Sequence, residues 1–236
     1  MPIFITLVTL VLAYLIGSIP SGLIIVKVAN GKDVRQIASG RTGGTNAMRA
    51  AGLLAGLLTA ALDVLKGVSA RWLVGWLSPG NNLLLVFAAL MTIVGHNYSI
   101  FLAERNEKGQ LRLRGGAGGA TTLGGAIALW LPAGFVILPL SVVIYLVIGY
   151  ASVTTMSVAF FAMLLFAYQA WMGTSPWVYA LYGLLAEGLV MWALRPNLQR
   201  LRQGNERPVG LRALYLKRKE EQAAREKAAA TSNQAP

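Results

Sequence analysis

Long apolar runs divide this chain, and they constrain its fold more than any other feature of the sequence. Each run is close to the length of about 20 residues with which a helix crosses the hydrocarbon core of a bilayer. In lipid the backbone must satisfy its own hydrogen bonds, so runs of this kind predict helices. The runs cover residues 3–28, 53–77, 83–102, 153–171 and 177–194.

The composition agrees with a protein that resides in a membrane. Of the 236 residues, 56% are hydrophobic and 13% are charged, and the mean hydropathy is +0.58, which is too apolar for an ordinary soluble domain. No basic segment precedes the first run, so we interpret it as a retained span and not as a cleaved signal peptide. The fold class expected is all-α, a polytopic membrane protein.

The stretch 120–151 decides how many spans are expected. It is too long for one comfortable helix and short for two, and Pro132 and Pro139, with Gly134 between them, interrupt it near the middle. Two short, broken segments are therefore expected there, which gives about seven transmembrane helices. Five is the alternative, if two of the weaker segments are re-entrant or interfacial.

The distribution of basic residues predicts the orientation. Lysines and arginines gather in the loops 30–51 and 103–118, whereas the turn 78–82 has none, so both basic loops are expected in the cytoplasm and the N-terminus outside. The tail from Arg195 holds ten of the 21 basic residues and is expected inside, which requires an odd number of spans. Its last part predicts a basic surface helix that attracts anionic membrane lipids. Nucleic acid is not an expected partner, because the charge lies on membrane-adjacent loops.

Two glycine-rich loops carry the residues best suited to hold an anion. Glycines allow the backbone to approach a ligand closely, and consecutive free N–H groups form a concave anion nest. Hydroxyls, an amide and arginine side chains add donors that match phosphate oxygens. A single loop of this kind is as often a solvated basic connector, but two in one membrane protein favour a site. The donors and glycines are Ser39, Gly40, Arg41, Gly43, Thr45, Asn46 and Arg49 in the first loop, and Arg114, Gly115, Gly116, Gly118 and Thr121 in the second.

Polar residues inside the spans are costly in lipid and so tend to have a task. Asp63 and Lys66 stand one helical turn apart, and they either pair with each other or present Lys66 to a phosphate. His96 is either a packed, hydrogen-bonding residue or part of a polar cluster with Asn97. The chain has no cysteine and one histidine, which excludes disulfides, thiolate nucleophiles and metal sites rich in cysteine or histidine.

These motifs, in this order, resemble those of the bacterial membrane acyl-phosphate:glycerol-3-phosphate acyltransferase family. The similarity covers nearly the whole chain up to Glu206. The matching segments are Gly17-Ser18-Ile19-Pro20 with Ser21-Gly22, Ser39-Gly40 and Gly43 through Asn46 to Arg49, Asp63-Val64-Leu65-Lys66-Gly67, Gly95-His96, Gly115-Gly116 with Gly118 and Ala120-Thr121, and Asn197, Arg200-Leu201, Gly204 and Glu206.

The resemblance implies a seven-helix enzyme of the bacterial cell membrane with its active site at the cytoplasmic face. Residues 1–206 would form the acyltransferase-like domain and residues 207–236 a basic cytoplasmic tail. The implied reaction moves a fatty acyl group from acyl phosphate to the primary hydroxyl of glycerol 3-phosphate and gives lysophosphatidic acid, without a metal or other cofactor. Since acyl phosphate is already activated, the protein need only hold two anions together and orient the hydroxyl.

No conventional catalytic residue is implied, because the phosphate of the donor can take the proton of the hydroxyl. The residues implied to bind the substrates and their phosphates are Ser39, Gly40, Arg41, Gly43, Thr45, Asn46, Arg49, Lys66, His96, Arg114, Gly115, Gly116, Gly118, Thr121, Asn197 and Arg200.

The chain departs from the family pattern at three positions. Ala117 stands where the family has a lysine, Leu194 where it has a histidine, and Arg41 where it has an asparagine. Arg41, or Arg112 and Arg114, would restore the positive charge in a new geometry. Two alternatives stay open beside the implied reaction: the same fold with another acceptor, and a noncatalytic relative that binds lipid or a partner. A transporter is less favoured, because no internal repeat is visible.

Overall fold

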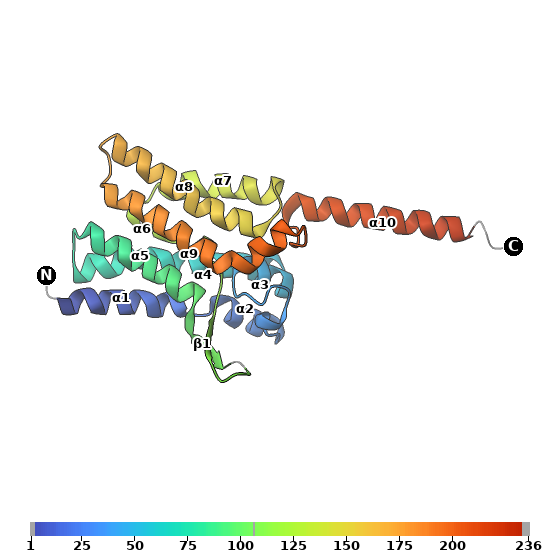
Figure 1. The fold of residues 1–236 in the computed structure, drawn as a ribbon, viewed down its shortest axis with the longest axis horizontal. Helices are drawn as coiled ribbons and strands as arrows, with labels where there is room; N and C mark the ends of the chain where they lie inside the picture. Colours follow the sequence, from blue (N-terminus) through green and yellow to red (C-terminus); the bar gives the residue numbers. More distant parts are fainter. Residues whose placement is uncertain (1–2, 106, 233–236) are drawn as a thin grey trace.

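The computed structural model describes residues 3–105 and 107–232 as a helical bundle with one hairpin and one projecting helix (Figure 1). The bundle helices run roughly along the long axis of the molecule. The helices are α1 (Ile3–Ser18), α2 (Ser21–Asn30), α3 (Gly44–Ala51), α4 (Leu53–Leu77), α5 (Asn82–Asn97), α6 (Gly119–Leu129), α7 (Ala133–Val147), α8 (Ala151–Trp171), α9 (Trp177–Arg202) and α10 (Gly210–Ser232), with a 3₁₀ turn η1 (Val34–Gln36).

The described part of the chain contains four helical segments long and apolar enough to cross a membrane. They are Ile3–Asn30, Leu53–Leu77, Ala151–Trp171 and Trp177–Arg202. Three shorter apolar helices accompany them, Asn82–Asn97, Gly119–Leu129 and Ala133–Val147. Large apolar side chains such as Phe135 and Trp76 remain exposed on the outside of the bundle, as a lipid-facing surface requires. The chain is therefore a mostly helical polytopic membrane protein.

Two of the expected spans differ from the structure in detail. The first run is interrupted after Ser18, and α2 begins at Ser21 directly after Pro20. A proline has no N–H group to continue the ladder of the preceding helix, so the run forms two helices. The stretch 120–151 does form two helices, α6 and α7, but only Pro132 separates them, since Pro139 lies inside α7.

The expectation of an all-α fold is wrong in one place. In the third run the helix ends at Asn97, and the last residues of the run belong to the strand β1 (Ser99–Arg105). This strand pairs antiparallel with β2 (Leu111–Arg114), with Arg105 opposite Leu111. Ile100 and Phe101 favour a strand by their shape, and Gly109 takes the positive φ of 72° that the turn requires.

Helices α4 and α6 pack closely against each other, and glycines on both helices allow this contact. A Cβ atom at Gly67 would overlap the carbonyl oxygen of Thr121, and one at Gly124 would overlap that of Val64. Only glycine permits this distance between the two backbones. Helix α6 is 11 residues long, about 16 Å, which is shorter than a hydrocarbon core of about 30 Å.

Candidate active site

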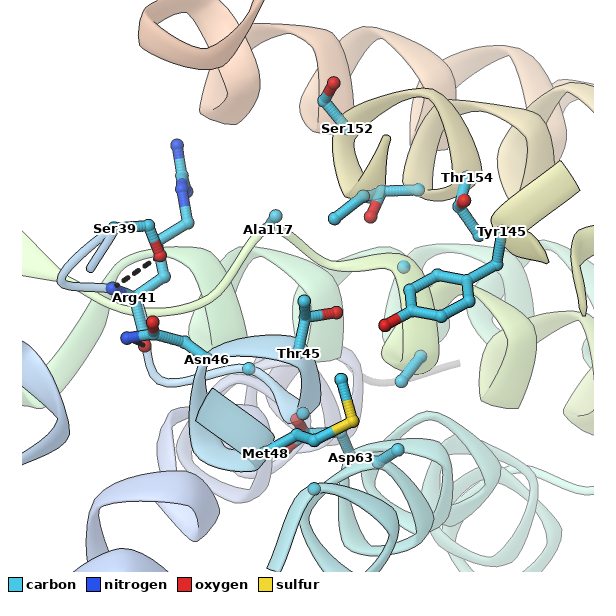
Figure 2. Close-up of a pocket in the computed structure, with 18 of the residues that line it drawn as sticks. Ser39, Arg41, Thr45, Asn46, Met48, Asp63, Ala117, Tyr145, Ser152 and Thr154 are labelled. Carbon is cyan, nitrogen blue, oxygen red and sulfur yellow. Dashed lines mark hydrogen bonds between the residues drawn. The ribbon is translucent and has the colours of Figure 1, made fainter. Parts of the chain in front are cut away.

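One large cavity of about 640 Å³ opens where the two glycine-rich loops meet the helices α3, α4, α7, α8 and α9. Figure 2 shows Ser39, Arg41 and Asn46 at one end and Tyr145, whose hydroxyl points into the cavity, at the other. The wall also has a long apolar part, formed by Leu53, Leu57, Leu123, Leu138, Val142 and Val158. The cavity is therefore amphipathic, with polar loops at one side and helix side chains at the other.

The first glycine-rich loop is folded around the side chain of Asn46. Its amide nitrogen donates hydrogen bonds to the carbonyl oxygens of Val34, Ile37 and Arg41, at 3.0, 2.9 and 2.8 Å. Gly40 takes a positive φ of 68°, which lets the loop turn back over η1. Asn46 thus shapes the loop as well as lining the cavity.

The guanidinium of Arg41 joins the first loop to the second loop and to α9. Nη1 donates to the carbonyl oxygen of Gly116 at 2.8 Å, and Nη2 donates to the carbonyl oxygen of Ala193. Burial and the neighbouring cation of Arg200 lower the pKa of Arg41 below its ordinary value. The guanidinium keeps its charge at neutral pH, in a partly desolvated place where no carboxylate of the described residues forms an ion pair with it. Such a cation is well prepared to receive an anion.

The second glycine-rich loop rests on the C-terminal end of α5. The backbone N–H of Gly116 donates to the carbonyl oxygen of His96 at 2.9 Å, and a Cβ atom at position 116 would overlap the imidazole. Gly118 takes a positive φ of 90° directly before α6. Ala117 and Gly118 line the cavity, and Ala117 contributes only a methyl group where a longer side chain would reach inward.

A buried group of titratable side chains lies behind this loop. Lys66 Nζ donates to Asp63 Oδ1 at 2.7 Å, and His96 Nδ1 lies 3.5 Å from the same oxygen. All three side chains are buried, and Asp63 and His96 also line the cavity. The sequence left two alternatives for Lys66, a pair with Asp63 or a contact with phosphate. The structure shows the pair with Asp63, and Lys66 does not line the cavity.

A carboxylate from the segment after α9 closes another side of the cavity. Glu206 accepts a hydrogen bond from Ser152 Oγ at 2.6 Å and another from the amide of Asn197 at 3.3 Å. Pro208 forms a bridge with Tyr150, so the segment is fixed to the turn between α7 and α8. These contacts hold the ends of α8 and α9 together beside the cavity.

The structure brings together ten of the sixteen residues expected to bind substrate. Those that line the cavity are Ser39, Arg41, Gly43, Thr45, Asn46, Arg49, His96, Gly118, Asn197 and Arg200. The other six are Gly40, Lys66, Arg114, Gly115, Gly116 and Thr121, which lie behind or beside the wall. Arg114 forms an ion pair with Glu104 in the hairpin, and Thr121 is buried in α6.

Several cavity residues were not among those expected from the sequence. Asp63 and Glu206 stood in recognised motifs, but they were not assigned to the site. Tyr145 is a single polar residue in an apolar run, and Ser152 and Thr154 belong to a group of small hydroxyl residues in α8 that no recognised motif contains. Leu194 and Ala117, the two apolar departures, both line the cavity.

The fold and the cavity define a multi-pass membrane protein with an amphipathic site at the junction of two glycine-rich loops. A family model described as glycerol-3-phosphate acyltransferase matches residues 7–204. The chain therefore belongs to the glycerol-3-phosphate acyltransferase family, as the motifs of the sequence indicate, and it is an integral membrane enzyme of this family.

Individual relatives agree over almost their whole length. The glycerol-3-phosphate acyltransferase 2 of Moorella thermoacetica is 39% identical over 210 residues, which are 88% of this chain and 99% of the relative. A glycerol-3-phosphate acyltransferase of Thermus thermophilus is 38% identical over 87% of this chain and 96% of its own. Crystal structures of PlsY (YgiH), an integral membrane glycerol 3-phosphate acyltransferase, superpose with TM-scores of 0.73 and 0.72 for the glycerol 3-phosphate and lysophosphatidic acid forms. The first of these is 28% identical and covers 89% of this chain and 98% of its own.

Proposed function

We propose that this enzyme transfers a fatty acyl group from acyl phosphate to the primary hydroxyl of glycerol 3-phosphate, giving lysophosphatidic acid and inorganic phosphate. The observation that carries the proposal is the amphipathic cavity, in which one continuous space joins the glycine-rich loops to an apolar wall. A phosphate suits the loops, and an acyl chain suits the wall. The names of the relatives and the ligands named for the PlsY structures support the same acceptor and product.

The volume of the cavity suits the reactants. About 640 Å³ lies within the range of roughly 300–1,000 Å³ that is usual for small-molecule sites. The apolar wall belongs to α4, α6, α7 and α8, so an acyl chain would lie between helices that face the lipid on their other side. Burial of each CH₂ group contributes about 0.8 kcal/mol, so this wall supplies affinity for the donor.

The phosphates would lie at the loops. The hydroxyls of Ser39 and Thr45, the backbone around Gly43 and the cation of Arg41 supply neutral and charged donors at one end of the cavity. A charge-assisted hydrogen bond contributes about 1.5–3 kcal/mol, and several of them converge here. Arg41 places positive charge beside Ala117, the position that lacks a lysine, and this supports its role as the replacement cation. The remaining wall residues Asn46, Arg49, His96, Gly118, Asn197 and Arg200 complete the proposed binding set, whereas the six residues outside the wall would shape it.

The chemistry requires positioning more than side-chain catalysis. The hydroxyl oxygen of the acceptor attacks the carbonyl carbon of the acyl phosphate, and the bond from that carbon to the phosphate oxygen breaks. The leaving phosphate takes the proton of the hydroxyl. Holding the two reactants together removes much of the entropic part of the barrier, and donors at the loops stabilise the developing oxyanion.

The orientation in the membrane follows from the same arrangement. Four described helical segments are long enough to cross a membrane, and three shorter apolar helices would bring the number of passes to seven. Seven passes put the N-terminus outside and the glycine-rich loops, the hairpin and the tail in the cytoplasm, where their basic residues are favoured. Glycerol 3-phosphate would then enter from the aqueous side, whereas the acyl donor would enter through the lipid-facing wall.

The proposal can be tested with purified protein in liposomes that receives palmitoyl phosphate and labelled glycerol 3-phosphate. The formation of labelled lysophosphatidic acid is measured, and heat-inactivated protein serves as the control. Product above this control is expected. If palmitoyl phosphate is consumed whether or not glycerol 3-phosphate is present, the acceptor is another hydroxyl compound. Binding of palmitoyl phosphate without turnover by folded protein would overturn the enzymatic role.

A further inference from the structure

Asp63 and Lys66, which form a buried cluster with His96, are assigned no part in the proposed transfer. Lys66 and Asp63 form a salt bridge of 2.7 Å inside α4, and His96 approaches the same carboxylate oxygen from α5 at 3.5 Å. Removing charges from water costs several kcal/mol for each ion, and replacing a buried pair by apolar residues is often neutral for stability. A cluster of this kind therefore calls for an explanation other than the stability of the fold.

His96 connects this cluster to the second glycine-rich loop. The carbonyl oxygen of His96 accepts the N–H of Gly116 at 2.9 Å, and the imidazole lies so close to Gly116 that a Cβ atom there would overlap Nε2. A Cβ atom at Gly115 would overlap the carbonyl oxygen of His96 in the same way. The imidazole of His96 thus packs against Gly116, whereas the backbone of His96 packs against Gly115.

The loop in turn holds Arg41. The carbonyl oxygen of Gly116 accepts Nη1 of Arg41 at 2.8 Å, and the carbonyl oxygen of Gly115 accepts the N–H of Thr42 at 3.4 Å. One chain of contacts thus runs from Asp63 through His96 and Gly116 to the guanidinium of Arg41. Because Asp63 is 1% exposed and Lys66 is 5% exposed, neither can itself be a freely accessible ligand for a substrate.

We propose that Asp63 is a positioning residue, which fixes the imidazole of His96 against Gly116 and so places the guanidinium of Arg41 in the cavity. Lys66 donates to the same carboxylate oxygen and balances its charge. The inference rests on the proposed function, since it concerns the binding of substrate phosphate by Arg41. The effect on the substrate passes through two backbone contacts, so it appears as a change in affinity.

The test removes the whole buried pair, so that no lone charge stays behind. Asp63→Leu combined with Lys66→Met keeps the approximate volume and leaves His96 without its partner. We expect a thermal unfolding midpoint close to that of the wild type and a KM for glycerol 3-phosphate or palmitoyl phosphate raised about tenfold or more, with a smaller change in kcat. Asp63→Asn combined with Lys66→Met retains an oxygen that faces His96 and is expected to restore part of the affinity.

The matched control lies in the same helix, one turn earlier. Thr59 is fully buried, its hydroxyl donates to the carbonyl oxygen of Ala55, and it does not line the cavity. Thr59→Val is expected to leave both KM values unchanged. In an Arg41→Ala background the Asp63 and Lys66 changes should have no further effect on KM, because both act on the same cation.

Unchanged KM values in a folded Asp63→Leu, Lys66→Met variant would overturn the inference and leave the cluster a buried ion pair only. If that variant does not fold, Asp63→Asn combined with Lys66→Met carries the test: a KM between those expected for the wild type and for the first variant supports the inference, and an unchanged KM would overturn it. Binding of inorganic phosphate, measured by calorimetry, separates this inference from the proposed function because it needs no turnover. A wild type without product would count against the function, whereas an equal Kd for phosphate in wild type and variant would count against the inference.

Discussion

Single residues in this enzyme act mainly through the backbone that they hold in place. Asn46 uses its amide to gather three carbonyl oxygens of the first loop, and His96 supports the second loop by its ring and its carbonyl group. Arg41 then joins both loops and α9. A change at such a position therefore affects the shape of the cavity as well as its charge.

Replacing Arg41 by alanine is expected to lower kcat/KM about tenfold to a hundredfold. The change removes a charge-assisted contact with phosphate, which contributes about 1.5–3 kcal/mol. Arg41→Lys should recover little, because an ammonium group cannot bridge the carbonyl oxygens of Gly116 and Ala193 as a planar fork does. The matched control is Arg35→Ala, since Arg35 pairs with Asp33 at the surface and does not line the cavity. Equal rates for wild type and Arg41→Ala would show that this cation is not the replacement for the missing lysine.

Replacing Gly116 by alanine is expected to lower activity at least tenfold, and to cost about 1–3 kcal/mol of stability. The new Cβ atom would overlap the imidazole of His96, so the loop or the ring must move. Gly188→Ala in α9 is the control, because a Cβ atom there meets no atom within 4 Å and alanine favours the helix by up to about 1 kcal/mol. Activity and thermal unfolding of both variants in the same detergent check the prediction; a fully active Gly116→Ala variant would show that the loop tolerates displacement.

At the scale of elements, the packing of the short helix α6 on α4 determines where the second glycine-rich loop lies. Helix α6 has 11 residues, and this loop directly precedes its N-terminus. Close contact with α4 through Gly67 and Gly124 buries this segment inside protein, where irregular backbone is tolerated. Helix α10 contrasts with this, since it projects away from the bundle along its long axis (Figure 1).

The two parts of the tail are expected to differ in importance. Val209 is buried, its N–H donates to Gly149, and Arg212 covers the ring of Tyr150, whereas residues 214–226 are exposed. A chain that ends at Leu216 should therefore retain kcat/KM within about twofold in neutral liposomes, since the residues 217–226 that it loses are exposed.

A chain that ends at Gln203 should be inactive, because it also loses Glu206 and with it the hydrogen bonds to Ser152 and Asn197. Assays of the two truncated proteins beside the full chain check both expectations. Loss of activity on removing only residues 217–236 would show that α10 contributes to the reaction itself.

For the whole molecule, the arrangement of the helices fixes which loops share one side of the membrane. In Figure 1 the turns between α4 and α5 and between α8 and α9 lie at the end of the bundle where α1 begins, whereas α10 leaves the opposite end. The glycine-rich loops belong to the half from which α10 departs. The proposed seven passes would agree both with this arrangement and with the distribution of basic residues.

Cysteine labelling in intact cells tests the seven-pass topology, and the chain offers a clean background because it has no cysteine of its own. Single substitutions at the exposed positions Pro79, Leu131 and Thr174 should react with a membrane-impermeant maleimide added outside. Lys108→Cys and Arg218→Cys should react only after permeabilisation. Protection of position 131 alone would indicate that α6 and α7 form a re-entrant pair and that five segments cross the membrane.

The sequence by itself determined the membrane class, the family and the residues of the two loops. Length and apolarity of a run decide whether it crosses a bilayer, and these are local properties. The same holds for the break at Pro132 and for the glycines and donors of the loops. The strand that begins at Ser99 was missed, because an apolar run of this length suits a helix equally well until its pairing partner is known.

Only the tertiary structure decided which of these residues meet. It placed Lys66 against Asp63 and away from the cavity, paired Arg114 with Glu104, and brought Ser152, Tyr145 and Glu206 to the cavity wall. These outcomes depend on how α4, α6 and α9 cross, and on contacts between segments up to 152 residues apart, such as the hydrogen bond from Arg41 to Ala193. Spacing along one helix sets which side chains share a face, but the packing of one helix on another decides what that face contacts.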